Sequence, residues 1–246
     1  NRDIVVIGDY SALSLCNDML RLNVPLRPVT APSEAMDGFL NVLDLALLRQ
    51  DEIPIGQLSA KSGDAARAYV QRATELALSG KIAGLVTLPI NKEAVRLTLP
   101  GFTGHTEYIA ALCGNPEVTM MLWSEKLAVT HVSTHVSMRD AVELVKKDRV
   151  LTVIRLTRDA LLGITGRPRI AVAGLNPHAG EGGLFGREEI EAIAPAIAQA
   201  RAQGIDAQGP FAPDTVFMRA RHAPPAHPGE FDVVVAMTHD HGLIPV

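Results

Sequence analysis

Three histidines lie in three separated polar motifs, and imidazole is a common ligand of divalent metal ions. His135 lies in Ser-Thr-His-Val-Ser-Met-Arg-Asp, His178 in Asn-Pro-His-Ala-Gly-Glu-Gly-Gly and His239 in Met-Thr-His-Asp-His-Gly. Each motif follows a short apolar, β-branched run and then continues into polar or glycine-containing sequence, which is where a strand ends and a loop begins. In open α/β sheets, ligands bind at that carboxyl edge. The three motifs therefore predict a metal site assembled from strand ends.

Two further histidines lie close to these motifs in the sequence. His131 and His135 form an HxxxH pair, which on a helix would place two imidazoles on one face. The β-branched residues around them favour an extended chain, in which the pair is separated by roughly 13 Å. We therefore expect His131 to be a buried strand residue and His135 to lie at the strand exit. His239 and His241, if extended, face the same side about 6.6 Å apart, so either is a candidate ligand.

Other polar residues are candidates for binding substrate or transferring protons. His105 and Thr106, in Phe-Thr-Gly-His-Thr-Glu, could hydrogen-bond a phosphate or carboxylate, or could only form a turn and a helix cap. Lys92 could bind an anion or transfer a proton if desolvated, with a solvated surface charge as the alternative. Neutral imidazoles suit zinc and other late divalent ions, whereas Asp240 would favour harder ions or support a ligand from outside the coordination sphere.

The elements expected to position these residues alternate between short strands and amphipathic helices. We expect strands at residues 4–8, 82–87, 118–123, 127–132, 170–175 and 233–237, and helices at residues 64–79, 140–162 and 188–203. A polar turn at Ser124 and Glu125 joins two of the strands in a hairpin. The pattern predicts an α/β protein with a mixed, mostly parallel sheet flanked by helices. Residues 222–229, rich in Pro, Ala and His, are expected to form an exposed loop.

Composition limits the classes of function. The 246 residues, 47% of them hydrophobic, can bury a large core as one α/β domain or as two interleaved subdomains. A net charge of −4 gives no cationic surface, so nucleic acid is not an expected partner. Cys16 and Cys113 have no CxxC spacing, which favours a reducing compartment and a structural or incidental role.

No apolar run approaches the roughly 20 residues of a membrane span, and the first residues predict a strand rather than a signal peptide. We therefore expect a cytoplasmic protein with no membrane partner. The sequence opens directly in a strand and closes just after a candidate ligand motif, so we expect the full protein to have further terminal segments.

Taken in order, the motifs resemble the 4-hydroxythreonine-4-phosphate dehydrogenase family of pyridoxal phosphate (pyridoxine) biosynthesis, together with its phospho-D-threonate and phospho-D-erythronate dehydrogenase relatives. The resemblance rests on Pro-Ile-Asn-Lys, Phe-Thr-Gly-His-Thr-Glu, Pro-Asp-Thr-Val-Phe and the three histidine motifs, and it spans nearly the whole chain. It implies two interleaved subdomains with the active site in the cleft between them. It also implies a homodimer with the site at the subunit interface and with metal ligands from both chains.

Carried over residue by residue, the resemblance implies that His135, His178 and His239 are the metal ligands and that His105 and Thr106 bind substrate. Lys92 and Asp240 are further candidates for proton transfer or for support of the ligands. Asp214, in Pro-Asp-Thr, has a similar role or caps a turn.

Where the family usually has Gln, this chain has His241, so the surroundings of His239 can differ. The glycine and proline loop with which the family begins, and its substrate-binding Lys, Asn and Arg positions beyond His-Asp, are not in this sequence.

The reaction implied by the resemblance is an NAD- or NADP-dependent oxidation of a secondary alcohol followed by decarboxylation, with a divalent metal (Zn, Mg or Co) holding the substrate. No GxGxxG fingerprint is present, so the cofactor rests on the resemblance alone. Gly-His-Thr-Glu favours a phosphorylated linear substrate over the cyclic dihydrodiol of other relatives. We expect 4-phosphohydroxy-L-threonine, converted to 3-amino-2-oxopropyl phosphate. D-threonate or D-erythronate 4-phosphate is the alternative, and a non-catalytic metabolite-binding protein is a third hypothesis.

Overall fold

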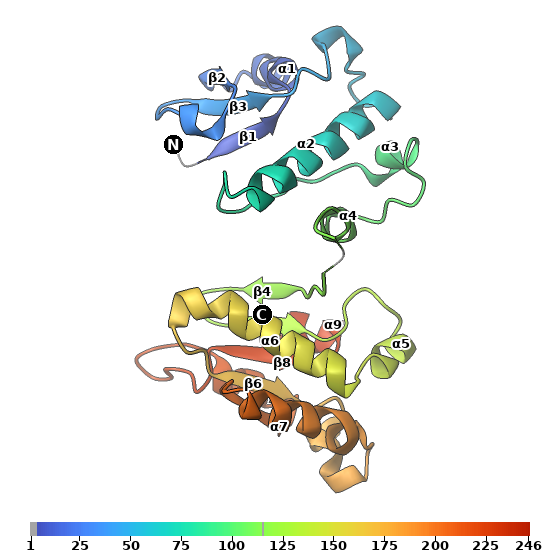
Figure 1. Ribbon diagram of the computed structural model, residues 1–246, viewed down its shortest axis with the longest axis vertical. Helices are drawn as coiled ribbons and strands as arrows, with labels where there is room; N and C mark the ends of the chain where they lie inside the picture. The colour runs from blue at the N-terminus through green and yellow to red at the C-terminus, as the bar shows by residue number, and fades with distance from the viewer. Residues whose placement is uncertain (1–3, 115) are drawn as a thin grey trace. The chain divides into compact units, whose positions relative to one another are not determined.

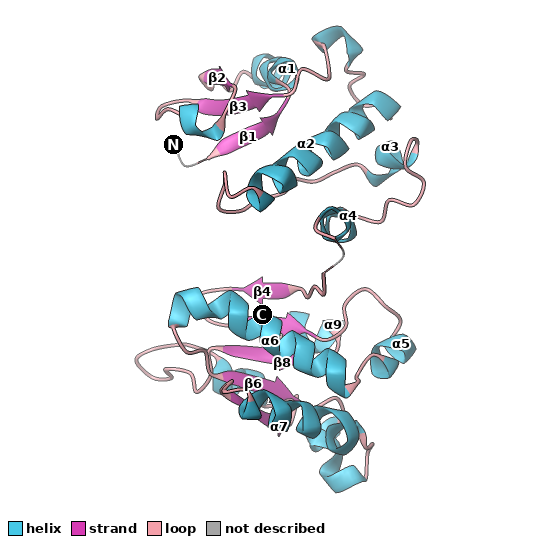
Figure 2. Cartoon of the chain, in the orientation of Figure 1, coloured by secondary structure: helices cyan, strands magenta, loops and turns pink. Residues whose placement is uncertain are grey.

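The computed structural model describes residues 4–114 and 116–246, which belong to two consecutive compact units, Asn1–Pro116 and Glu117–Val246 (Figure 1). Each unit combines parallel strands with helices (Figure 2). The predicted α/β class is therefore confirmed. No helix within the described residues is long and apolar enough to cross a bilayer.

The first unit is built on a three-stranded parallel sheet in the order β1-β3-β2. Its elements are β1 (Val5–Gly8), α1 (Tyr10–Leu20), β2 (Leu26–Val29), a 3-10 turn (Pro32–Glu34), β3 (Leu40–Asp44), a second 3-10 turn (Gln50–Glu52), α2 (Ala60–Leu78), α3 (Lys92–Arg96) and α4 (His105–Leu112). Leu76 of α2 packs against Val29 and Leu43 of the sheet. Among these elements, β1 and α2 were predicted from the sequence.

Helix α2 begins earlier than its apolar pattern indicates, because Ser59 caps it by accepting a hydrogen bond from the amide of Ser62. Gly63 lies against the backbone of α3, and a Cβ there would approach the amide nitrogen of Val95 to 2.8 Å. The close contact of α2 with α3 holds the segment that begins with Lys92.

The strand predicted at residues 82–87 is wrong. The segment has no regular structure, and Val86 is 94% exposed. Ile82 packs at the edge of the core of the first unit, but no described strand pairs with the segment. An apolar run becomes a strand only where a neighbour accepts and donates its backbone hydrogen bonds.

The second unit contains a five-stranded sheet in the order β4-β5-β8-β6-β7. Its elements are β4 (Met121–Trp123), β5 (Ala128–His131), α5 (Met138–Glu143), α6 (Lys147–Thr165), β6 (Ile170–Ala173), a turn (Pro177–Gly183), a π-helical turn (Glu189–Ile193), α7 (Ala194–Ala202), β7 (Ala207–Phe211), α8 (Val216–Ala220), β8 (Val233–Ala236) and α9 (His239–Leu243). β4 and β5 form the predicted antiparallel hairpin, and the other pairs are parallel. The sheet is therefore mixed and mostly parallel, as expected.

The two faces of this sheet bury different helices. In β8, Val233 and Val235 join the core formed with α6 and α7, whereas Val234 and Ala236 join the core formed with α8. This alternation follows from the two-residue period of a strand. Because both faces are covered, β8 is an unbroken apolar run rather than an alternating one.

Three local predictions need correction. The helix expected at residues 140–162 is two helices, α5 and α6, because Ser137 caps α5 through the amide of Asp140 and the chain turns before Lys147. The helix expected at residues 188–203 begins with a π-helical turn before α7. The chain after β8, whose extended form would place His239 and His241 on one side, is the short helix α9. Residues 222–229 form the expected loop.

Candidate functional site

The three histidine motifs follow the carboxyl ends of three neighbouring strands of the second unit. His135 follows β5, His239 follows β8 and His178 follows β6, and these strands are adjacent and parallel. The pairing of β5 with β8 continues past the strand ends. Val132 donates its amide to the carbonyl of Ala236, and Ser133 donates both its amide and its hydroxyl to the carbonyl of Met237. The chains that carry His135 and His239 are thereby held side by side.

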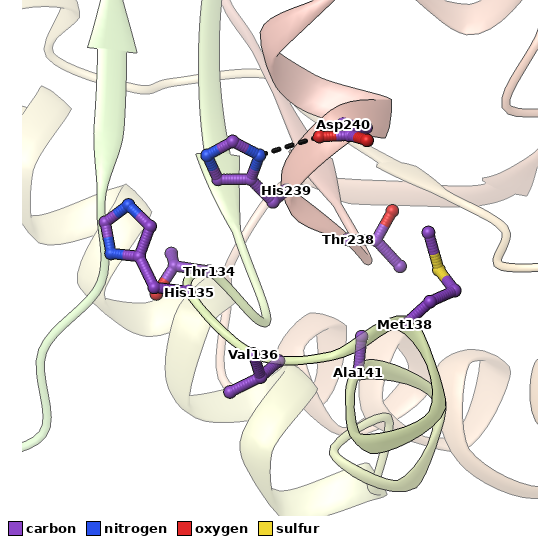
Figure 3. Close-up of a pocket in the computed structure, with 8 residues that line it drawn as sticks. All are labelled: Thr134, His135, Val136, Met138, Ala141, Thr238, His239 and Asp240. Carbon is purple, nitrogen blue, oxygen red and sulfur yellow. Dashed lines mark hydrogen bonds and ion pairs between the residues drawn. The ribbon is translucent and has the colours of Figure 1, made fainter.

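His135 and His239 share a pocket of about 300 Å³ (Figure 3). Their ring centroids are 5.5 Å apart, with planes inclined at 49°. The pocket is lined by Thr134, His135, Val136, Met138, Ala141, Thr238, His239 and Asp240. The separation is close to that of two imidazoles sharing one ion, since each ring nitrogen lies about 2.0–2.1 Å from a bound zinc.

Asp240 determines which nitrogen of His239 can bind a ligand. Nδ1 of His239 donates to the carboxylate of Asp240 at 2.8 Å (Figure 3). A carboxylate only accepts, so the proton is on Nδ1 and the lone pair is on Nε2. This is the carboxylate–histidine arrangement that orients imidazole ligands of metals.

Thr238 provides a second sign that the pocket receives a ligand. Its side chain is 2% exposed and lines the pocket, yet its Oγ1 has no hydrogen-bond partner among the described residues. A buried hydroxyl without a partner is costly. The two imidazoles suit a divalent ion as ligands, and the hydroxyl suits a substrate that is bound to that ion. No feature of the sequence had singled out Thr238.

His178 does not line the pocket. Its ring lies 6.3 Å from that of Phe185, on the exposed turn after β6. Within residues 4–114 and 116–246, no set of three or more His, Cys, Asp or Glu side chains is arranged to hold a metal ion. One chain therefore brings together two of the three predicted ligands and leaves the third apart.

The turn that carries His178 is left-handed over five consecutive residues. From His178 to Gly182 every φ lies between 45° and 81°. His178, Ala179 and Glu181 are not glycines, and each such residue in this region costs about 1–2 kcal/mol. The turn must therefore be stabilised by its surroundings.

The two neighbouring histidines lie outside the pocket. His131 is fully buried in β5, as expected, and its Nδ1 bonds to the carbonyl of Met120. Burial lowers its pKa, so the ring is held neutral. His241 follows His239 by two residues on α9, which rotates the two side chains by about 200°. The extended form that would place both rings on the same side is therefore not adopted, and burial lowers the pKa of His241 as well.

The first unit brings together the other candidate residues. Lys92 begins α3, whereas His105 and Thr106 begin α4. A Cβ on Gly104 would lie 3.7 Å from Nζ of Lys92, so the ammonium group lies beside the start of α4. Lys92 is exposed.

Asp214, in the second unit, is exposed in the turn before α8 and lines no part of the pocket.

A mixed α/β fold with imidazoles, a carboxylate and an unpartnered hydroxyl at the carboxyl edge of its sheet has these groups where α/β proteins bind their ligands. Known relatives of the chain are named dehydrogenases, which assigns the protein to the oxidoreductases. The chain belongs to the family of the pyridoxal phosphate biosynthetic protein PdxA, whose family model matches residues 1–246. The family resemblance drawn from the motifs is confirmed.

Individual relatives match almost the whole chain. It is 44% identical to D-threonate 4-phosphate dehydrogenase of Salmonella typhimurium, covering 99% of this chain and 74% of the relative. It is 46% identical to 4-hydroxythreonine-4-phosphate dehydrogenase of Beijerinckia indica, covering 100% and 72%. The crystal structure of 4-hydroxythreonine-4-phosphate dehydrogenase from Klebsiella pneumoniae superposes with a TM-score of 0.87 at 43% identity, covering 98% and 72%.

Proposed function

We propose that residues 1–246 act as one dehydrogenase unit that oxidises 4-phosphohydroxy-L-threonine with NAD or NADP and releases 3-amino-2-oxopropyl phosphate and carbon dioxide. Hydride passes from the carbon that bears the hydroxyl to the nicotinamide, and the hydroxyl proton is released, which gives a ketone. The carboxylate on the adjacent carbon is then lost as carbon dioxide, the electron pair of the broken C–C bond passes to the ketone as an enolate, and that carbon takes up a proton. The observation that carries the proposal is the pocket shared by His135 and His239 in a chain of the PdxA family.

The metal would be held by Nε2 of His239 and by the ring of His135. When bound, a divalent ion such as Zn, Mg or Co supplies Lewis acidity to the oxygens of the substrate. Asp240 keeps His239 in the tautomer that leaves Nε2 free, so we assign Asp240 to ligand support rather than to proton transfer. The unpartnered hydroxyl of Thr238 is placed to bond a substrate oxygen in the same pocket.

In a homodimer, His178 of one subunit would complete the set of metal ligands in the other subunit. It lies outside the pocket of its own chain, and its side chain is exposed, so a second copy of the chain can reach it. The family resemblance implies ligands from both subunits, which agrees with a pocket holding two imidazoles. We therefore place His135 and His239 from one subunit and His178 from the other around each ion.

Lys92, His105 and Thr106 would bind the phosphate of the substrate. Lys92 carries a positive charge beside the start of α4, where backbone amides and the helix dipole favour an anion. Its exposure favours anion binding over proton transfer, because a lysine that transfers protons is normally desolvated.

D-threonate 4-phosphate, or the related D-erythronate 4-phosphate, is the second candidate substrate. Relatives named D-threonate 4-phosphate dehydrogenase match at up to 44% identity, which lies within the 41–46% of relatives named 4-hydroxythreonine-4-phosphate dehydrogenase, so sequence identity favours neither substrate. These substrates share the phosphate, the secondary alcohol and the carboxylate, and they differ at the carbon that bears an amino or a hydroxyl group.

The test follows reduction of NAD and NADP by the full-length protein with each of the three substrates, with and without a chelator. His135→Ala should abolish turnover, whereas His222→Ala, in the exposed loop, should not. Turnover of D-threonate or D-erythronate 4-phosphate alone would select the alternative. No turnover of any substrate by metal-loaded protein would refute a dehydrogenase and favour a metabolite-binding protein.

A further inference from the structure

We propose that Glu189 is a positioning residue that holds the left-handed turn and thereby sets the place of His178. This inference rests on the proposed role of His178 as a metal ligand. Glu189 lies eleven residues after His178, at the start of the helical segment that leads into α7, and none of its side-chain bonds is to His178 itself.

The carboxylate of Glu189 is buried, and both of its oxygens accept hydrogen bonds. Glu189 is only 3% exposed. Oε1 accepts the amides of Leu175 at 2.7 Å and Asn176 at 2.8 Å, and Oε2 accepts Nδ2 of Asn176 at 2.9 Å. No described Lys, Arg or His forms an ion pair with it, so these three donors are what compensate for the burial of its charge.

The turn closes around this carboxylate. A Cβ on Gly180 would lie 2.6 Å from Oε2, and a Cβ on Gly174 would lie 3.0 Å from Oε1. A side chain at residue 180 would therefore displace the carboxylate, and one at residue 174 would make a tight contact with it. The residues that follow β6, the middle of the left-handed turn and the following helix therefore all meet at the same two oxygens.

His178 is linked to this centre through a short and restricted piece of chain. It is two residues after Asn176, with Pro177 between them and φ of 53° at His178 itself. Asn176 also accepts the amide of Ala179 at 3.1 Å, which closes the turn on its N-terminal side. Because His178, Ala179 and Glu181 do not favour left-handed φ, loss of the carboxylate should allow the turn to relax and His178 to move.

Glu189→Gln is the sharpest test, since it keeps the volume and changes one acceptor oxygen into a donor. If the remaining oxygen accepts the two backbone amides, the new NH₂ faces Nδ2 of Asn176, and donor meets donor. Glu188→Gln is the matched control. Glu188 is the adjacent residue, it is more exposed, and its carboxylate accepts Nδ2 of Asn176 but no amide of residue 175 or 176.

Three measurements on the full-length protein separate the possible outcomes. Hydrogen exchange at the amides of Leu175 and Asn176 reports on the turn. Titration with Co²⁺ alone reports on the ligands, and the separate values of kcat and KM report on turnover. We expect Glu189→Gln to keep the circular dichroism of the wild type, to exchange these amides faster and to bind Co²⁺ about 10- to 100-fold more weakly. Glu188→Gln should change Co²⁺ affinity by less than about 3-fold, because Glu188 bonds only the side chain of Asn176 and both backbone amides stay bonded to Glu189.

The inference would be overturned if folded Glu189→Gln bound Co²⁺ with the wild-type affinity, whether or not amide exchange changed. If Glu189→Gln does not fold, Glu189→Asp replaces it, because aspartate keeps the charge but withdraws the oxygens from the amides. Weaker Co²⁺ binding by Glu189→Asp would then support the inference, and Co²⁺ binding with the wild-type affinity would overturn it. His178→Ala is measured in parallel. Unchanged Co²⁺ binding by His178→Ala would refute the proposed ligand, whereas weakened binding by His178→Ala but not by Glu189→Gln would refute only the role of Glu189.

Discussion

Replacing Gly242 by alanine should push α9 away from β5 and displace His239, which begins that helix. A Cβ at Gly242 would overlap Nε2 of His131 and would lie 2.7 Å from Cδ2 of the same ring and 2.9 Å from Cγ1 of Val129. Ordinary contacts begin at about 3.4 Å, so relieving the contact with Cδ2 takes about 0.7 Å of movement, and relieving the overlap with Nε2 takes more. His131 is fully buried and bonded to Met120, so it has little room to withdraw.

The expected cost follows from this overlap. Inserting a methyl group into a packed interior lowers the free energy of unfolding by about 1–3 kcal/mol. Because His239 lies three residues before Gly242 on the same short helix, the movement should also separate it from His135. Gly242→Ala should therefore lose both stability and Co²⁺ affinity.

Urea denaturation of a double-mutant cycle measures the effect. His131→Ala removes the ring and leaves room for the new methyl group, so Gly242→Ala should cost less in that background by about 0.5–3 kcal/mol. Gly163→Ala is the matched control, because Gly163 lies in α6 with no neighbour within 4 Å of a Cβ, and alanine there should stabilise the helix by up to about 1 kcal/mol. If Gly242→Ala costs the same with and without His131, the overlap is not the cause and the reasoning is refuted.

Three other predictions concern the metal ligands and the ion pair at the opposite edge of the sheet. Asp240→Asn should weaken Co²⁺ binding about 10- to 100-fold, because an amide does not hold His239 in one tautomer; an unchanged titration would contradict this. His178→Ala and His239→Ala should each be inactive, yet a refolded mixture should recover activity in the mixed dimer, which has one intact site; no recovery would place all ligands in one chain. Asp232 accepts three hydrogen bonds from Arg169. Burial alone would raise the pKa of Asp232, but these bonds hold it below its usual 3.8. The pair therefore stabilises the fold above about pH 3.8, and this stabilisation is lost as the pH falls through the lower folded value. Urea denaturation should show wild type and Asp232→Asn converging in stability at acid pH, and a constant difference would contradict the assignment.

The sequence alone determined the class of the protein, its family and one edge of its sheet as the candidate site. Apolar runs that end in polar motifs predicted β5, β6 and β8, and parallel strands necessarily place the residues that follow them at one edge. His135 and His239 were found in this way, and the hairpin of β4 with β5 followed from its polar turn. These features depend on local periodicity, which a single sequence contains.

Tertiary structure decided what depends on distant partners. The apolar run at residues 82–87 lacks a described strand to pair with it, so its pattern did not make it a strand. The turn at His178 is left-handed although three of its five residues disfavour that conformation, and Glu189, whose sequence context marks it only as a helix residue, supplies the bonds that hold it. Gly242 is restricted by His131, more than a hundred positions earlier. Such contacts are formed between residues that are far apart in the chain, so they leave no local pattern, and they determine where the predicted ligands finally lie.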